Sequence, residues 1–215
     1  MSPLVFTDVD ETLIGCKSMF DFLDYYLAGR YGAAGRHRAG VVWADIRARA
    51  AAGVPRGETN RAYYRTLAGE PAGAVARWSE RWFADRVRGR FYVRTTRAAL
   101  REHLAGGAVL VLVSGSFPAL LDPIARDVGA AHVLCTRPEI RAGTYTGEIV
   151  GSPMIGEGKR AAVRALLDRY PAVDPAGCFG YGDHVSDLPM LEEVGHPVMV
   201  GPDGRHTDLV RGVRG

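Results

Sequence analysis

The chain has 215 residues, 47% of them hydrophobic and 24% charged, and a formal net charge of +3. This composition is ordinary for a globular protein in water, and the length allows one large domain or a core with a smaller insert. No apolar run approaches the roughly 18 residues that a membrane span needs, and no basic segment followed by an apolar signal region opens the chain. We therefore expect a cytoplasmic protein with no membrane partner.

The spacing of the cysteines argues against a zinc-binding or disulfide-rich protein, and the placement of the positive charges argues against a nucleic-acid-binding protein. Cys16, Cys135 and Cys178 lie far apart and form no CxxC pair, so neither a zinc site nor a disulfide framework is expected. Residues 16–95 hold 15 Lys and Arg against 7 Asp and Glu, and a basic segment can face an anionic ligand or nucleic acid. Its arginines are scattered among Ala and Gly as on solvated helix faces, without the interleaved aromatic residues of a nucleic-acid platform. We expect no nucleic-acid partner.

The first predicted element is a strand from Leu4 that runs into two carboxylates, Asp8 and Asp10. In a regular strand, side chains two residues apart lie on the same face. Two such charges repel, which raises the pKa of one of them unless a cation lies between. A small number of oxygen ligands suits Mg²⁺. With Glu11 beside them, the two aspartates also fit a solvated acidic turn, so the assignment depends on partners elsewhere in the chain.

The segment that follows is predicted to be helical up to about Arg94. Apolar side chains recur there at helical spacing, with a first break at Gly29. The four expected helices cover about 17–28, 34–51, 58–68 and 72–88. The stripe of Val75, Trp78 and Trp82 is expected in the core rather than in a ligand site. Four short helices without strands predict a small bundle inserted after the first strand.

The rest of the chain alternates between strands and helices. Residues 109–113 are apolar at every position, which is typical of a central strand covered on both faces of a parallel sheet. The other expected elements are a helix over about 95–105, a helix over 117–128, a strand over 132–135, a hairpin over 138–150 with its turn at 142–143, a helix over 156–169, a strand over 178–181, a helix over 186–194, a strand over 197–200, and an irregular tail with one helical turn.

This alternation predicts an α/β fold, with a mostly parallel sheet, right-handed crossovers and helices on both faces. The predicted division assigns residues 1–15 and 95–215 to the core and residues 16–94 to a helical insert. In such sheets, ligands bind beyond the carboxyl ends of the strands. Asp8, Ser114 and Asp183 each follow a predicted strand, so we expect them to converge on one site.

Together these residues can support phosphoryl transfer to a carboxylate. Asp8 would attack the phosphorus atom and bind Mg²⁺, and Asp10 would protonate the leaving oxygen and then activate water against the aspartyl-phosphate. The Ser114 side chain and the backbone N–H groups of Gly115 and Ser116, at a helix N-terminus, would form an anion site for the phosphate.

The remaining candidates surround this centre. Lys17 and Lys159 are the only lysines among 27 basic residues, and a compact ammonium kept in an arginine-rich chain suggests a local role. Lys159 would neutralise the charge shared by the nucleophile and the phosphate. Asp183 would complete the metal shell, and Asp187 would orient a metal-bound water. His184 is expected to line the pocket rather than to bind Mg²⁺.

The segments DVDET, SGS, GEGK and GDHVSD, in this order, resemble the four motifs of the haloacid dehalogenase superfamily of aspartate-nucleophile phosphatases. Residues 181–191 resemble the branch that contains phosphoserine phosphatase, subfamily IB. The resemblance covers residues 1–15 and about 95–200. It implies a Rossmann-like core, a helical cap at the place of the insert, Mg²⁺ as cofactor, and Asp10 as a ligand through its backbone carbonyl. The predicted metal ligands are therefore Asp8, Asp10, Asp183 and Asp187.

One position departs from that branch, whose members place a glutamate nine residues after the nucleophile to meet the amino group of phosphoserine. Lys17 stands there. It also fits a solvent-facing hinge residue, but a cation in the pocket would repel an ammonium. It would favour a leaving group with a carboxylate, a second phosphate or several hydroxyls.

With Lys17, Ser116 and His184 as substrate contacts, the sequence predicts Mg²⁺-dependent hydrolysis of a small phosphomonoester other than phosphoserine. Three alternatives stay open: a phosphoserine phosphatase, a phosphotransferase with the same intermediate, and a non-catalytic binding protein on the same scaffold. The complete set of motif residues argues against the last of these.

Overall fold

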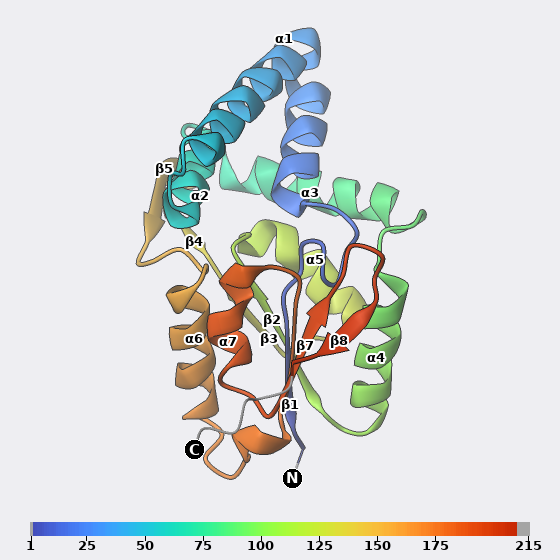
Figure 1. Cartoon of the computed structure of the whole chain (residues 1–215). Coiled ribbons are helices and arrows are strands. Elements are labelled where there is room, and N and C mark those ends of the chain that lie inside the picture. The colour runs from blue at the N-terminus through green and yellow to red at the C-terminus, as the bar shows by residue number, and fades with distance from the viewer. Residues whose placement is uncertain (1, 210–215) are drawn as a thin grey trace.

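A six-stranded sheet carries the fold. In the computed structural model, which describes residues 2–209, the strand order is β3-β2-β1-β6-β7-β8 (Figure 1). The strands are β1 (Leu4–Thr7), β2 (Val109–Ser114), β3 (His132–Cys135), β6 (Phe179–Gly182), β7 (His196–Val200) and β8 (His206–Asp208). β1 pairs in parallel with β2 and β6, and within this sheet only the edge strand β8 runs antiparallel. The predicted α/β fold is confirmed.

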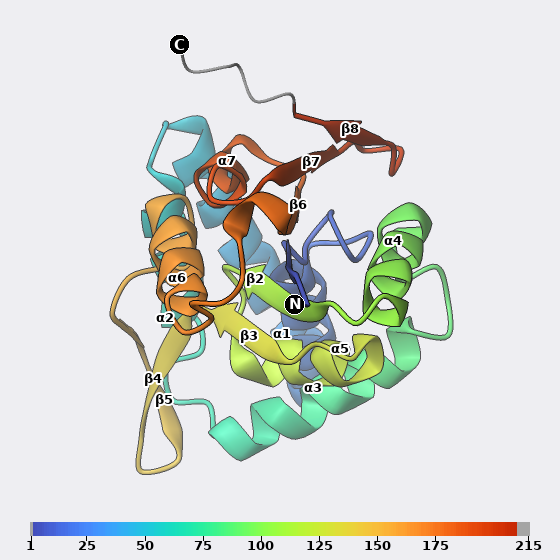
Figure 2. The ribbon, with the colours of Figure 1, turned by 90° about the horizontal axis from the view of Figure 1, so that it is seen from below.

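Helices cover both faces of this sheet (Figure 2). The helices are α4 (Arg94–Ala105) and α5 (Pro118–Val128) on one face, and α6 (Glu157–Leu167) and α7 (Leu188–Leu191) on the other. Because successive side chains of a strand point to opposite faces, Val5 joins the apolar cluster that includes α5, whereas Leu4 and Phe6 join the cluster of α6 and α7. This two-sided burial explains why β1 and β2 are apolar at nearly every position.

The helical insert lies between β1 and α4 and consists of α1 (Ser18–Ala51), α2 (Arg56–Arg65) and α3 (Ala72–Arg86). α1 bends into two arms at Gly32, whose φ of 59° and ψ of −131° favour glycine. The break expected at Gly29 is therefore three residues too early. A Cβ atom at Gly29 would lie 2.3 Å from ring atoms of Trp78, so this glycine permits close helix packing instead.

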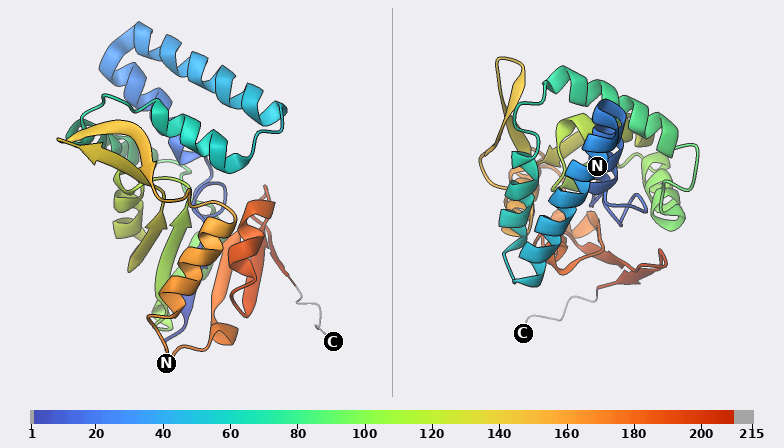
Figure 3. Two further views of the ribbon diagram at one scale, coloured as in Figure 1. Left: turned by 90° about the vertical axis from the view of Figure 1, so that its left-hand side faces the viewer. Right: turned by 90° about the horizontal axis from the view of Figure 1, so that it is seen from above.

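The insert covers the carboxyl ends of the strands (Figures 1 and 3). Its helices pack on one another and also on the core, because their apolar side chains share one cluster with residues of the core. Trp82 is fully buried beside Phe22 and Phe91, and Ser79 Oγ of α3 donates to the carbonyl of Ala119 in α5 at 2.6 Å. The expectation that Trp82 belongs to the core is confirmed.

A buried carboxylate joins the two arms of α1. Glu70, in the loop between α2 and α3, is only 3% exposed. It accepts hydrogen bonds from the hydroxyls of Tyr26 and Tyr31, before the bend, and from Arg38, after it. Since a buried carboxylate is costly unless it is paired, these donors fix the bend of α1 and hence the direction of its second arm.

The predicted hairpin is present as β4 (Arg137–Arg141) and β5 (Thr144–Val150). It lies beside α2 (Figure 3), and the contact is close at Gly147, where an added Cβ would lie 3.3 Å from the Cα of Arg65. The irregular tail predicted after Gly201 is wrong in part. Residues 206–208 form β8 against β7, and the predicted helical turn is absent from the described part of the tail, which ends at residue 209.

No helix within residues 2–209 combines the length and the apolar character that crossing a bilayer requires.

Candidate active site

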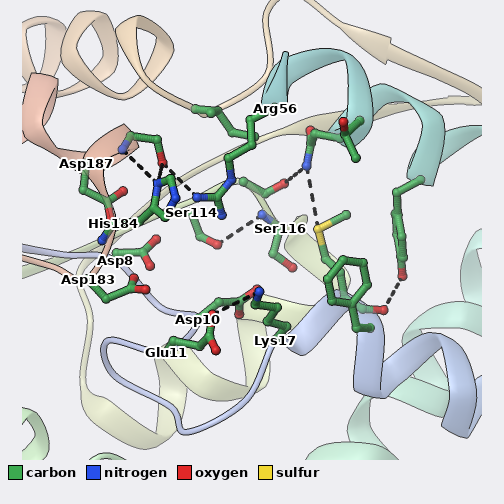
Figure 4. Close-up of a pocket in the computed structure, with 18 of the residues that line it drawn as sticks. Asp8, Asp10, Glu11, Lys17, Arg56, Ser114, Ser116, Asp183, His184 and Asp187 are labelled. Carbon is green, nitrogen blue, oxygen red and sulfur yellow. Dashed lines mark hydrogen bonds and ion pairs between the residues drawn. The ribbon is translucent and has the colours of Figure 1, made fainter. Parts of the chain in front are cut away.

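A cavity of about 450 Å³ lies between the carboxyl ends of the strands and the helical insert (Figure 4). Its wall includes every site residue expected from the sequence: Asp8, Asp10, Lys17, Ser114, Gly115, Ser116, Lys159, Asp183, His184 and Asp187. The convergence follows from topology, because β1 lies between β2 and β6. Parallel neighbours end at the same edge of the sheet, so Asp8, Ser114 and Asp183 meet there.

Three carboxylates form a cluster at this edge. Asp8, Asp183 and Asp187 each offer an oxygen, and these atoms lie within 4.8 Å of one another. Thr12 Oγ1 donates to Asp183 Oδ1 at 2.9 Å, and the backbone N–H of His184 donates to Asp187 Oδ2 at 3.1 Å. These second contacts fix the orientation of the carboxylates.

The chemistry of this donor set fits a hard divalent cation such as Mg²⁺, which prefers carboxylate oxygens. Asp10 lies outside the three-carboxylate cluster. Its Oδ1 is buried and has no hydrogen-bond partner among the described residues. A buried acceptor without a donor is costly. A ligand that contacts this oxygen would relieve that cost.

Lys159 is buried among these acids. Its Nζ donates to Asp8 Oδ1 at 2.5 Å and to Asp187 Oδ1 at 2.7 Å. Burial by itself would lower the pKa of Lys159, but the charges of the two aspartates and their hydrogen bonds raise it above its ordinary value. The ammonium therefore stays charged and offsets part of the negative charge of the cluster.

The pKa values of the two N-terminal aspartates are raised. Burial, together with the nearby charges of Asp187 and Asp10, raises the pKa of Asp8 to about 8 against the opposing effect of Lys159. Burial also raises the pKa of Asp10 to about 6, although hydrogen bonds from Ser18 oppose the shift. Asp10 can therefore hold a proton close to neutral pH, as a general acid requires.

These shifts predict a pH-dependent response to Mg²⁺. The native state binds protons at Asp8 and Asp10 more tightly than the unfolded state, where the pKa is near 3.8. The free energy of unfolding of the metal-free protein should therefore fall as pH rises from about 4 to 8. Mg²⁺ binds the ionised carboxylates, so it should raise Tm more at pH 8 than at pH 5. Free Mg²⁺ at 100 times its Kd would raise the free energy of unfolding by about 2.7 kcal/mol.

Thermal melts with and without MgCl2 at the two pH values measure this difference. Asp183→Asn, which removes one carboxylate of the cluster, serves as the control and should reduce the Mg²⁺-induced shift. An equal shift at both pH values would contradict the assignment of these carboxylates as metal ligands.

The predicted anion site lies at the end of β2. Ser114 and Ser116 are buried, and the N–H of Ser116 donates to Ser114 Oγ at 3.1 Å. The loop leads directly into α5, which begins at Pro118. A helix N-terminus presents free N–H groups and a partial positive charge, so the loop is suited to a phosphate.

Lys17 is not an isolated cation. Its Nζ lies 3.3 Å from Glu11 Oε2, and the two side chains are 47% and 50% exposed. A half-exposed ion pair of this kind contributes little to stability, but it makes this wall of the cavity nearly neutral. The argument from Lys17 against a substrate ammonium is weaker than the sequence suggested, because Glu11 supplies a carboxylate beside it.

The structure also brings residues to the cavity that the sequence did not single out. Arg47, Arg56 and Asn60 of the insert line it. We expected these arginines on solvated helix faces, because nothing in their spacing distinguishes them from the other arginines of the insert. Their position depends on the bend of α1 and on the packing of α2, which no local pattern reports. Arg56 Nη1 donates to Ser186 Oγ at 3.2 Å, across the mouth of the cavity.

His184 lines the cavity, as expected. Its Nδ1 accepts a hydrogen bond from the N–H of Ser186 at 3.0 Å, so it caps the short helical turn that holds Asp187. Because Nδ1 accepts this bond, the proton of the neutral ring lies on Nε2, so neither nitrogen offers a free lone pair to a metal.

Comparisons with known proteins point to one family. The family model described as haloacid dehalogenase-like hydrolase matches residues 5–192. A probable phosphatase of Mycobacterium tuberculosis is 44% identical over 106 residues, which are 48% of this chain and 36% of that protein. A phosphoserine phosphatase of the same organism is 36% identical over 116 residues, which are 54% of this chain and 37% of that protein. The chain thus spans little more than a third of the length of these curated relatives.

A solved structure extends the similarity over the full fold. A protein of unknown function from Bordetella pertussis Tohama I has a TM-score of 0.78 and 28% sequence identity, and the match covers 93% of this chain and 90% of that one. The helical insert and the sheet are therefore shared with a protein of similar size.

Proposed function

The chain belongs to the haloacid dehalogenase-like hydrolases, in the branch that resembles phosphoserine phosphatase, and from this membership we propose that it is a phosphatase that hydrolyses a small phosphomonoester through an aspartyl-phosphate. The observation that supports this most directly is the contact of Lys159 with Asp8 inside a cluster of three carboxylates. A buried cation beside a buried carboxylate fits a nucleophile that has to approach an anion.

In the first step, a carboxylate oxygen of Asp8 attacks phosphorus and forms an O–P bond, while the bond from phosphorus to the leaving oxygen breaks. Asp10 gives its proton to that oxygen, so the leaving group departs as a neutral alcohol. Its raised pKa, about 6, keeps part of the Asp10 population protonated near neutral pH. The products are an aspartyl-phosphate at Asp8, ionised Asp10 and the free alcohol.

In the second step, Asp10 acts as a base. It takes a proton from a water molecule as the water oxygen attacks the aspartyl-phosphate, the bond to Asp8 breaks, and inorganic phosphate leaves. Both aspartates return to their starting states, so atoms and charges balance over the cycle. Lys159 and the Ser114–Ser116 loop hold the phosphoryl oxygens in both steps.

Asp8, Asp183 and Asp187 would hold Mg²⁺ together with the backbone carbonyl of Asp10. When bound, the cation would offset the repulsion between the carboxylates and the phosphate.

The wall of the cavity restricts the leaving group. Arg47 and Arg56 have no acidic partner among the described residues, and Arg56 donates to the neutral hydroxyl of Ser186. Phe20 and Ile46 add apolar surface to the same cavity. We therefore favour a leaving group with an apolar stretch and a second anionic group, which the guanidinium groups would bind.

Phosphoserine is the second candidate. A relative that is 36% identical over half of this chain is a phosphoserine phosphatase, and the carboxylate of Glu11 beside Lys17 could meet an ammonium. The carboxylate of phosphoserine would then face the arginines. The two candidates differ in the leaving group alone, so a substrate comparison separates them.

We also propose that residues 16–94 act as a cap over a core formed by residues 1–15 and 95–215. Closure would exclude bulk water and bring Lys17 and the two arginines onto the leaving group. The insert residues that line the cavity support this division.

Phosphate release from a panel of phosphomonoesters tests the proposed function. The purified protein should release phosphate from an aryl phosphate in the presence of Mg²⁺, lose this activity in EDTA and regain it when Mg²⁺ is added. Esters whose leaving group carries a second anionic group should have a higher kcat/KM than phosphate esters of uncharged sugars. Phosphoserine enters the same panel, and product analysis with added alcohols detects phosphotransfer. No phosphate release from any ester would rule out the proposal.

A further inference from the structure

Two side chains of α2 contact the Ser114–Ser116 loop, the phosphate loop, at one carbonyl, and Ser18 Oγ of α1 adds a contact to Ser116 Oγ at 3.3 Å. The oxygen of Gly115 accepts a hydrogen bond from the Tyr64 hydroxyl at 2.8 Å and from Asn60 Nδ2 at 3.0 Å. Both donors belong to α2 and are four residues apart, so they lie on one face of the helix. Asn60 is in van der Waals contact with this turn, because a Cβ at Gly115 would lie 3.5 Å from Asn60 Nδ2.

This carbonyl shares a peptide group with the N–H of Ser116. A trans peptide is planar, with its C=O and N–H pointing in opposite directions. Donors that hold the oxygen of Gly115 therefore also fix the direction of the Ser116 N–H, which points to Ser114 Oγ (Figure 4). Hydrogen bonds to the carbonyl polarise the peptide and strengthen its N–H as a donor.

The far side of the loop is also held. The carbonyl of Ser116 accepts from the N–H of Thr136 at 3.0 Å, so the core fixes the next peptide. The oxygen of the peptide between Gly115 and Ser116 is held instead by two side chains of the insert. Tyr64 is fully buried, and burial holds the pKa of its hydroxyl well above the usual range, so it remains a donor at any working pH.

We propose that Tyr64 and Asn60 are positioning residues that orient the Ser116 N–H, and with it the Ser114 hydroxyl that this N–H holds, for phosphate, so that docking of α2 on the core sets the affinity of the loop. This inference rests on the proposed function only in taking the Ser114–Ser116 loop as the phosphate site. If Tyr64 and Asn60 have this role, the phosphate site is complete only while α2 is docked on the core.

Two substitutions separate positioning from stability. Tyr64→Phe removes one donor. Asn60→Leu removes the other donor together with Asn60 Oδ1, a buried acceptor that has no partner among the described residues. Because loss of an unsatisfied buried acceptor relieves a cost, Asn60→Leu should keep or raise Tm while it weakens phosphate binding.

Tyr63→Phe is the matched control. Its hydroxyl is a buried donor on the same helix, but it bonds to the carbonyl of Met19 at 2.9 Å and not to the loop. It should lower Tm about as much as Tyr64→Phe does, without the same loss of phosphate affinity.

The readout is the affinity for inorganic phosphate, from calorimetry and from inhibition of aryl phosphate hydrolysis, with Mg²⁺ present. Each single variant should weaken phosphate binding about three- to tenfold, the loss expected for one hydrogen bond. KM should rise with it, and kcat should change less. Wild-type phosphate affinity in Tyr64→Phe and Asn60→Leu would overturn the inference, as would an equal loss in Tyr63→Phe.

The calorimetric measurement of phosphate binding distinguishes failure of the positioning role from failure of the proposed function. A wild-type protein that binds phosphate but hydrolyses no ester would refute the proposed phosphatase activity, while weaker binding by the two variants would still support the positioning role. A wild-type protein that binds no phosphate would overturn both.

Discussion

Asp8→Asn is expected to lower kcat on an aryl phosphate by about four orders of magnitude or more, the scale of loss when a covalent nucleophile is removed. Asn has the same shape as Asp but cannot form the acyl phosphate, so no bypass through the same intermediate exists. Residual hydrolysis would have to use water directly, with Lys159 and the phosphate loop still in place.

The fold should survive this substitution. Asp8 is buried, and burial raises its pKa to about 8, so the ionised side chain is unfavourable in the metal-free protein. A neutral amide of equal volume removes that cost, and Tm at pH 8 without Mg²⁺ should not fall. Asp168→Asn, an exposed aspartate at the end of α6, is the matched control. Mass spectrometry shows whether the Asp8→Asn protein has deamidated back to Asp. A kcat near that of the wild type in protein without deamidation would falsify the nucleophile assignment.

Lys159→Met is expected to have the second largest effect, and it should act on both activity and stability. Removing a charged donor to the phosphoryl group costs about 10²–10³ in kcat. The free energy of unfolding should also fall, because Asp8 and Asp187 lose the buried cation that each contacts. Breaking a buried ion pair on one side costs about 3–5 kcal/mol.

The pH dependence of this loss identifies its cause. At pH 5, Asp8 in the variant is protonated, because its folded-state pKa is raised and the opposing effect of Lys159 is gone. The stability deficit should therefore be small at pH 5 and grow towards pH 8. Mg²⁺ should restore part of the stability at pH 8 without restoring kcat. Chemical denaturation at the two pH values, with and without Mg²⁺, measures these differences.

The other lysine supplies the control for stability. Lys17 is half exposed and paired with Glu11, and such pairs contribute at most about 1 kcal/mol. Lys17→Met should therefore leave the free energy of unfolding nearly unchanged at both pH values. Equal stability losses in the two lysine variants would show that the buried contacts of Lys159 do not have the assigned role.

The candidate catalytic centre was predictable because the chemistry proposed for it is tied to local patterns. A carboxylate at the end of an apolar strand is visible in the sequence, and parallel strands end at one edge of the sheet. Asp8, Ser114 and Asp183 therefore could be placed together before any coordinates, and the two isolated lysines stood out from an arginine-rich background. The alternation of strands and helices was sufficient for the fold class.

Only the tertiary structure decided how the insert meets this centre. The bend of α1 at Gly32, the pairing of Lys17 with Glu11, and the arrival of Arg47 and Asn60 at the cavity depend on contacts between segments far apart in the chain. A helical pattern shows which side chains are apolar but not which neighbour will cover them. The amino-acid sequence by itself therefore determined which residues meet at the candidate reaction centre, whereas long-range packing determined the part of the cavity wall that the insert supplies.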